Sequence, residues 1–129
     1  MIHLVLKHKR FFKALSRASR YKRLYLLAQA TSEPILVLGQ CIHDIIQKKI
    51  PLSEKDTVKI IRGGFLPYIK HCSKHYQDED IIRSVLTRQG GFLQYILLSC
   101  IKSVEKNIRR KYGDTESSTS EESEYEDEF

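Results

Sequence analysis

The sequence lacks any long apolar run. A helix that crosses a membrane needs about 18–20 consecutive apolar residues. The longest candidate, Phe92–Ile101, is about half that length and is interrupted by Gln94 and Ser99. We therefore expect no stable membrane span. The chain becomes cationic directly after Met1–Leu6, which is the reverse of the order in a signal peptide, so we expect no such peptide.

Cysteine is scarce, and its count is odd. With three cysteines and no expected signal peptide, the simplest interpretation is an intracellular protein with reduced, mostly packed thiols. Cys41-x-His43 and His71-Cys72-x-x-His75 supply enough ligands for a four-coordinate zinc ion, but not at a familiar spacing. On a helix, Cys41 and His43 point about 200° apart, so a buried Cys41 with an exposed His43 is the better interpretation. We predict no metal and no cofactor.

Catalytic signatures are missing too. The sequence contains no G-x-x-x-x-G-K-[ST] phosphate loop, no H-E-x-x-H motif and no G-x-S-x-G motif. Neighbouring acids occur only at Asp78-Glu79-Asp80 and near the C-terminus, where a helix start and a solvated segment explain them. The sequence therefore predicts a protein that is not an enzyme.

Lysine and arginine are absent from 113–129, which holds eight of the 16 acids. The remaining 1–112 carries all 22 basic residues and eight acids, so its net charge is +14, against +6 for the whole chain. We predict a basic helical domain over 1–112 and a disordered, acidic, Ser/Glu-rich tail over 113–129. Ser118, Thr119 and Ser123 each precede an acid by three residues, a pattern favoured by acidophilic kinases. The tail is thus either phosphorylated at these residues or an unmodified solvating segment.

The body is predicted to be all-α, because strand-like alternation is absent and the punctuating residues are typical of helix ends. We expect a compact bundle of about five to six short helices followed by the disordered acidic tail. Ser19 and Ser53 are the expected caps of two of them. The expected helices span about His3–Arg17, Arg20–Ala30, Thr31 to Lys48 or Lys49, Ser53–Ile61, Asp80–Arg88 and Phe92–Lys111. Gly63-Gly64 breaks or kinks the fourth of them, which Phe65–His75 is expected to continue as a short helix.

Apolar spacing assigns an inward face to the first three helices. The residues predicted to face inward are Leu4, His8, Phe11, Phe12 and Leu15, then Leu24, Leu27 and Ala28, then Ile35, Leu38, Ile42, Ile45 and Ile46. In the first helix, a band of positive charge is expected on the opposite face, formed by Lys9, Arg10, Lys13 and Arg17.

Nucleic-acid binding is the natural use of so much positive charge. The candidate contact residues are Lys7, Lys9, Arg10, Lys13, Arg17, Arg20, Lys22 and Arg23, with Arg109, Arg110 and Lys111 in the last helix. Tyr21 and Tyr25 interleave with these cations and either stack on a ligand or pack in the core. Contacts of this kind carry little sequence information and weaken with salt. The alternative is an ordinary solvated basic face.

A diglycine near-repeat is the most unusual pattern in the chain. The pattern R-(x)-G-G-F-L-x-Y-I occurs at Arg62–Ile69 and again at Arg88–Ile96. One interpretation is a flexible, protease-accessible hinge followed by an apolar docking segment. The other is a helix C-cap followed by a core helix.

Four segments occur in the same order in a known protein family. They are Leu15–Ser19, Cys41–Ile46, Ile50–Ser53 and the second diglycine segment, Gly90–Leu93. Over about residues 12–100, the chain resembles small basic proteins encoded by Maverick/Polinton elements and adenovirus-like (adintovirus) genomes, a family likened to the adenoviral mu core-protein precursor. The chain has Gln94 where the family has proline, and its middle is less lysine-rich, so the resemblance does not extend direct nucleic-acid binding to that segment.

The resemblance implies a minor virion or core-associated protein that binds double-stranded DNA non-specifically in the host nucleus and the virion. Capsid proteins and a maturation protease are further implied partners. Adenoviral maturation proteases favour [M/I/L]-x-G-G, which Ile61-Arg62-Gly63-Gly64 matches, so the resemblance implies cleavage after Gly64. Two alternatives remain open. One is a helical module that bridges capsid and core, and the other is a membrane-active virion peptide.

Overall fold

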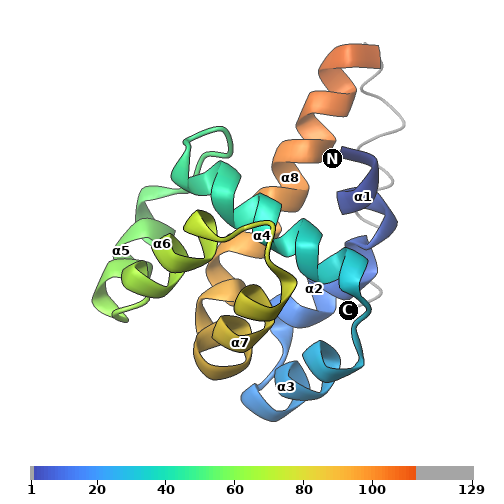
Figure 1. Ribbon diagram of the computed structural model, residues 1–129. Helices are drawn as coiled ribbons and strands as arrows, with labels where there is room; N and C mark the ends of the chain where they lie inside the picture. Colours follow the sequence, from blue (N-terminus) through green and yellow to red (C-terminus); the bar gives the residue numbers. More distant parts are fainter. Residues whose placement is uncertain (1, 113–129) are drawn as a thin grey trace.

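The computed structural model describes the backbone of residues 2–112 and the side chains of 3–108. Within this part of the chain every element is helical and no strand occurs (Figure 1). The elements are α1 Ile2–Lys7, α2 Lys9–Arg17, α3 Arg20–Gln29, α4 Ser32–Ile46, α5 Glu54–Arg62, α6 Leu66–Lys74, α7 Glu79–Gln89, the 3-10 turn η1 Gly90–Phe92, and α8 Leu93–Tyr112. The all-α prediction is confirmed, with more helices than expected. The predicted tail and its phosphorylation candidates Ser118, Thr119 and Ser123 lie outside the described residues.

Side-chain caps fix three of the helix starts. An oxygen of Ser19, of Ser53 and of Asp78 accepts the backbone N–H three residues further on, at 3.4, 3.1 and 3.3 Å respectively. Caps of this kind satisfy N–H groups that have no partner within the helix. The predictions for Ser19 and Ser53 are therefore confirmed, and α7 begins within a residue of the acidic start expected for it.

The first predicted helix is wrong in one respect, because it is two helices. The chain breaks at His8, where φ is −105° and ψ is 19°. His8 Nε2 and Lys7 Nζ lie 2.7 and 2.8 Å from the same carboxylate oxygen of Glu33, at the start of α4. These hydrogen bonds, that from Lys7 first, lower the pKa of Glu33. The break lets α1 reach α4 while α2 packs along α8.

The third predicted helix, α4, ends at Ile46 instead of at Lys48 or Lys49. Lys48 adopts a left-handed conformation with φ 62°. Its N–H bonds the carbonyl of Ile45 at 3.0 Å, and the next N–H bonds that of Asp44 at 2.8 Å. This is a Schellman ending, in which the left-handed residue is usually glycine. Because lysine occupies that position here, the sequence did not reveal where the helix ends.

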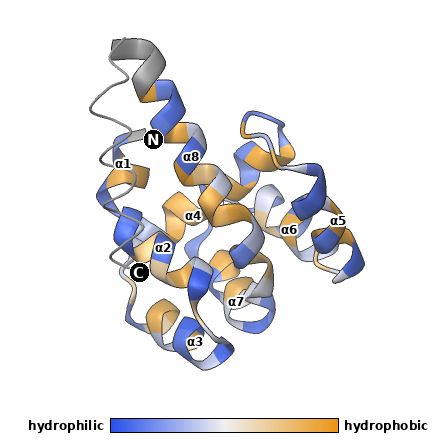
Figure 2. Cartoon of the chain, turned by 180° about the vertical axis from the view of Figure 1, so that it is seen from behind, coloured by the Kyte–Doolittle hydropathy of each residue, from blue (hydrophilic) through white to orange (hydrophobic). Residues whose placement is uncertain are grey.

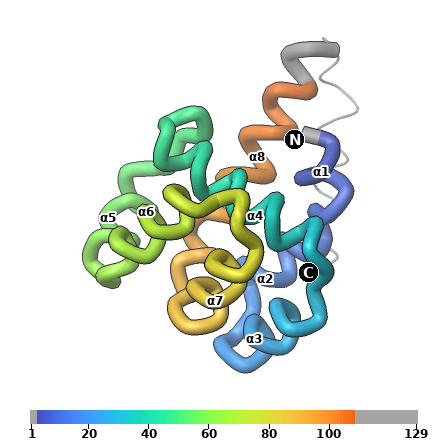
Figure 3. Tube along the Cα trace, viewed as in Figure 1, coloured from blue at the N-terminus to red at the C-terminus, as the bar shows by residue number. Residues whose placement is uncertain are grey.

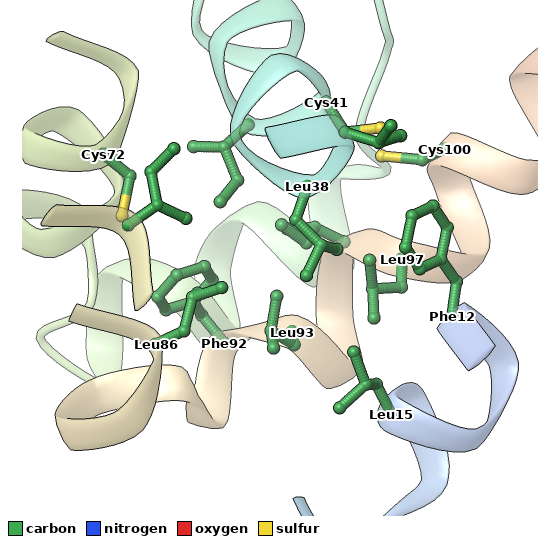
Figure 4. Close-up of a cluster of buried hydrophobic side chains, with 14 of the residues drawn as sticks. Phe12, Leu15, Leu38, Cys41, Cys72, Leu86, Phe92, Leu93, Leu97 and Cys100 are labelled. Atoms are coloured by element: carbon green, nitrogen blue, oxygen red, sulfur yellow. The ribbon is translucent and has the colours of Figure 1, made fainter. Parts of the chain in front are cut away.

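The core lies between α4 and the first half of α8, with α2, α6 and α7 packed around them (Figure 4). Figure 2 shows apolar and polar stretches on most helices, as expected for elements that bury one face. Fully buried side chains in Figure 4 include Phe12, Leu15, Leu38, Leu86, Phe92, Leu93 and Leu97. The α4 stripe is buried at Ile35, Leu38 and Ile42 and half-buried at Ile45 and Ile46. Ala28, predicted to face inward, is exposed.

All three cysteines are buried and form no disulfide. The thiols of Cys41 on α4 and Cys100 on α8 face each other across the core (Figure 4). The hydrogen bond with Cys41, together with burial, raises the pKa of Cys100 well above its usual value, and burial raises the pKa of Cys72 to about 12. Thiols held protonated in this way react slowly. The expectation of packed thiols is confirmed.

Helix α3 lies at one end of the bundle, while α5 and α6 form a separate side of it (Figures 1 and 3). The later turns of α8 extend past the other end, beside α1. The fold thus leaves α3 as a peripheral helix with one face against the bundle.

Among the described helices, none combines the length and apolarity that crossing a membrane requires.

Candidate nucleic-acid interface

The N-terminal cations that the sequence grouped together fall into two environments. Lys9 and Lys13 are only 8% and 7% exposed, so the prediction that they face solvent is wrong. Lys9 forms an ion pair with Glu105 on α8. Both lysine side chains are buried because α2 packs along α8, which is far from α2 in the sequence. A buried ammonium that is already paired is a poor phosphate ligand.

Two exposed cations, Arg20 and Lys22, lie in the first turn of α3. Arg10 and Arg17 on α2 are also exposed. Lys7 is exposed and forms an ion pair with Glu33. The side chains of the predicted contact residues Arg109, Arg110 and Lys111 lie outside the described residues.

Two tyrosines stand out from the surface of α3. Tyr21 is 84% exposed and Tyr25 is 60% exposed, so the interpretation that they pack in the core is wrong. Residues four apart on a helix lie on the same face, one turn above the other. Lys22 Nζ lies 5.8 Å from the centroid of the Tyr25 ring, within the range of a cation–π contact. We call Arg20, Tyr21, Lys22 and Tyr25 the α3 surface.

Arg23 differs from its two basic neighbours because it faces the bundle. Its side chain is half-buried beside Gly90, and its Nε is buried without a hydrogen-bond partner among the described residues. Burial and, after it, the charge of Arg20 lower the pKa of Arg23. Two guanidinium groups are therefore close enough to repel each other, and an anion near the first turn of α3 would relieve that repulsion.

The local charge of α3 is also unbalanced. Acidic side chains occupy the first turns of α4, α5 and α7, where they oppose the positive end of the helix dipole, whereas α3, like α1, α2, α6 and α8, has none there. The other end of α3 is held by Arg83, which donates hydrogen bonds to the carbonyls of Leu27 at 2.8 Å and Ala30 at 3.1 Å. Arg83 also pairs with Glu79 at 2.7 Å. The helix is thus fixed to the bundle from its C-terminal end, which leaves its basic first turn exposed.

The residues considered for zinc do not assemble. Among the described residues, no group of three or more His, Cys, Asp or Glu side chains is placed to hold a metal ion. His43 is half-buried and stacks on Tyr76 with the ring centroids 4.0 Å apart. Its Nδ1 lies 3.0 Å from Ser73 Oγ. These contacts give His43 a packing role.

The proposed cleavage sequence ends α5. Ile61, Arg62, Gly63 and Gly64 are all exposed. Gly64 has φ +73°, which L side chains rarely adopt, and the following N–H of Phe65 bonds the carbonyl of Ile60 at 3.1 Å. This is again a Schellman ending. The C-cap interpretation is therefore confirmed here, and the same residues are accessible from solvent.

An apolar groove lies between the end of α4 and the α5–α6 pair. Its volume is about 540 Å³. Its lining includes Ile45, Ile50, Leu52, Ile61 and Leu66. The groove is lined by residues of α4, α5, α6 and the loop between α4 and α5, and by none of α3, so the groove and the α3 surface are separate features of the described chain.

The comparisons with known proteins add no relative. No protein-family model, curated protein or solved structure matches the chain. The features of the chain that bear on its function are the α3 surface and the charge of the body.

Proposed function

We propose that this chain is a non-enzymatic DNA-binding protein, a minor virion or core-associated component of a Maverick/adenovirus-like element that acts in the host nucleus and the virion. The observation that carries the proposal is the α3 surface, where two exposed cations, Arg20 and Lys22, lie beside the two exposed tyrosines. Exposed cations of this kind contact phosphates and fix no base sequence. Binding is therefore non-specific and depends on salt.

The first experiment measures DNA affinity against salt concentration. Affinity falls as salt concentration rises, and each phosphate contact contributes about −0.9 to the slope of log affinity against log salt concentration for duplex DNA. The variant Arg20→Ala/Lys22→Ala should make that slope less negative by about 2 and weaken binding about tenfold at low salt. Fluorescence anisotropy with a labelled duplex of random sequence measures both quantities.

The matched control is Lys70→Ala/Lys74→Ala, which removes the same charge from exposed positions on α6. Its effect on the slope should be much smaller, because α6 lies on a different side of the bundle from α3. Equal losses in the two variants would show that binding follows net charge alone and would contradict an interface on α3.

The acidic tail provides a second prediction. With eight acids and no lysine or arginine, 113–129 is complementary in charge to the body and should compete with DNA for it. Deleting 113–129 should raise DNA affinity several-fold at about 50 mM salt, and the gain should shrink by about 200 mM as screening increases. Unchanged affinity in anisotropy titrations at low salt would refute the competition.

A protein-interaction module that bridges capsid and core is the second candidate function. The apolar groove between α4 and α5–α6 favours it, because exposed apolar surface beside a groove is typical of protein contacts. Salt-dependent DNA retention separates the two functions. A protein that fails to bind DNA at low salt but co-purifies with its capsid protein would support the bridge.

The membrane-active alternative requires a large rearrangement. The apolar segment after the second diglycine supplies Phe92, Leu93, Ile96 and Leu97 to the core, all fully buried. Exposing that segment would dismantle the contacts between α4 and α8. Liposome leakage before and after proteolysis is the test, and leakage by the intact protein would favour this alternative.

A further inference from the structure

We propose that the α3 surface binds unpaired bases, so that the protein prefers single-stranded DNA to duplex DNA of the same length. The inference rests on the proposed function and specifies its substrate class. It starts from two observations that phosphate binding does not require, the 84% exposure of Tyr21 and the 60% exposure of Tyr25.

The two rings are placed for stacking. They lie four residues apart on one face of α3, so that their rings occupy successive turns. Phosphate contacts need only cations, and burying two large aromatic side chains would otherwise favour folding. Aromatic rings beside cations on an open surface are the usual platform for single-stranded nucleic acid, in which base faces are accessible. In a duplex the base faces are already stacked on one another, and such rings cannot reach them.

The charge around the rings argues against a protein occupant. Lysine is depleted in the cores of protein interfaces, whereas here Lys22 lies over the ring of Tyr25. A second copy of the same surface would bring its exposed cations, Arg20 and Lys22, against like charges. A strand with negative phosphates and exposed bases complements both features at once.

The experiment compares a labelled 20-nucleotide single strand with the corresponding duplex, using the full chain at one low salt concentration. The wild type should bind the single strand more tightly. Tyr21→Ala/Tyr25→Ala should weaken binding of the single strand about tenfold to a hundredfold and change duplex binding less than about twofold. Tyr21→Phe/Tyr25→Phe keeps both rings and should retain the preference.

Tyrosine fluorescence gives a direct readout, since the chain has seven tyrosines and no tryptophan. Stacked bases should quench part of the emission when the single strand is added, and the Ala double variant should lose that part. Tyr68→Ala is the matched control, because Tyr68 is an exposed tyrosine on α6. It should leave both affinities unchanged, and unfolding curves should show that all the variants fold.

Two results would overturn the inference while leaving the proposed function standing. One is equal affinity of the wild type for single strand and duplex. The other is an equal loss of affinity for both DNAs in the Tyr21→Ala/Tyr25→Ala variant. Absence of binding to either DNA would overturn the proposed function and this inference together.

Discussion

The two diglycine segments share the letters G-G-F-L-x-Y-I but occupy opposite environments. Gly63 and Gly64 are exposed and end α5, and Phe65 after them is half-buried. Gly90 is buried in the turn η1, and Phe92 after it is fully buried at the entry to α8. The same local sequence therefore links α5 to α6 through an exposed turn in one place, and links α7 to the central helix α8 through a buried turn in the other.

The two segments differ because one of them covers the other. The ring centroid of Phe65 lies 6.0 Å from that of Phe92 and 6.5 Å from that of Tyr95. Gly91 lies directly below, where an added Cβ would be 3.2 Å from Phe65 Cζ. The first segment thus forms part of the environment of the second. The comparison shows that partner helices, and not the motif, decide which segment is buried.

The largest expected effect is a loss of stability when the phenylalanine of each diglycine segment is replaced by alanine. Phe92→Ala should lower the free energy of unfolding by about 3–5 kcal/mol, because it removes a fully buried ring and leaves a cavity. Phe65→Ala should cost about 1–2 kcal/mol, because its ring is already partly exposed. Urea unfolding followed by circular dichroism measures both. Similar losses in the two variants would contradict the difference in environment.

The second difference between the two diglycine segments should be their rate of cleavage by a protease. Under the proposed function, a maturation protease that recognises [M/I/L]-x-G-G is expected to cleave after Gly64 at least about 100-fold faster than after Gly91, since the second site opens only when the core opens. Arg88 also departs from the protease's recognition pattern, so Arg88→Ile is the decisive control. It supplies the preferred residue at an exposed position without exposing the second diglycine. Mass spectrometry should still find the product of cleavage after Gly64, and rapid cleavage after Gly91 would refute the role of burial.

Local sequence was enough for much of the fold. The helix content followed from apolar spacing, and the starts of α3 and α5 followed from Ser19 and Ser53, because a cap acts within one turn. The break at His8 was not predictable, since it depends on contacts with Glu33 in a distant helix. Nor was the end of α4 at Ile46, because a left-handed lysine leaves no glycine signal.

The candidate site was predicted less completely than the fold. Charge counting grouped the cations of the N-terminal helices but could not separate the exposed Lys22 from the buried Lys9, whose partner Glu105 is remote in sequence. The tyrosines of α3 were recognised as candidates for stacking, yet composition could not decide whether they were buried. Only the packing of α3, with one face on the bundle, shows that Tyr21 and Tyr25 are exposed.

The smallest effect concerns the glycines themselves. Gly64→Ala should lower the free energy of unfolding by about 1 kcal/mol, because φ +73° is strained for alanine even though no atom lies within 4 Å of the new Cβ. Gly90→Ala should change it by less than about 0.5 kcal/mol, since its new Cβ would meet Arg23 Nε at 3.4 Å and Leu93 Cδ1 at 3.7 Å with no unusual φ. The exposed glycine is therefore expected to be the less replaceable one, which reverses the usual link between burial and sensitivity. Thermal unfolding of the two variants tests this order, and a larger loss at Gly90 would mean that space, and not backbone conformation, limits both positions.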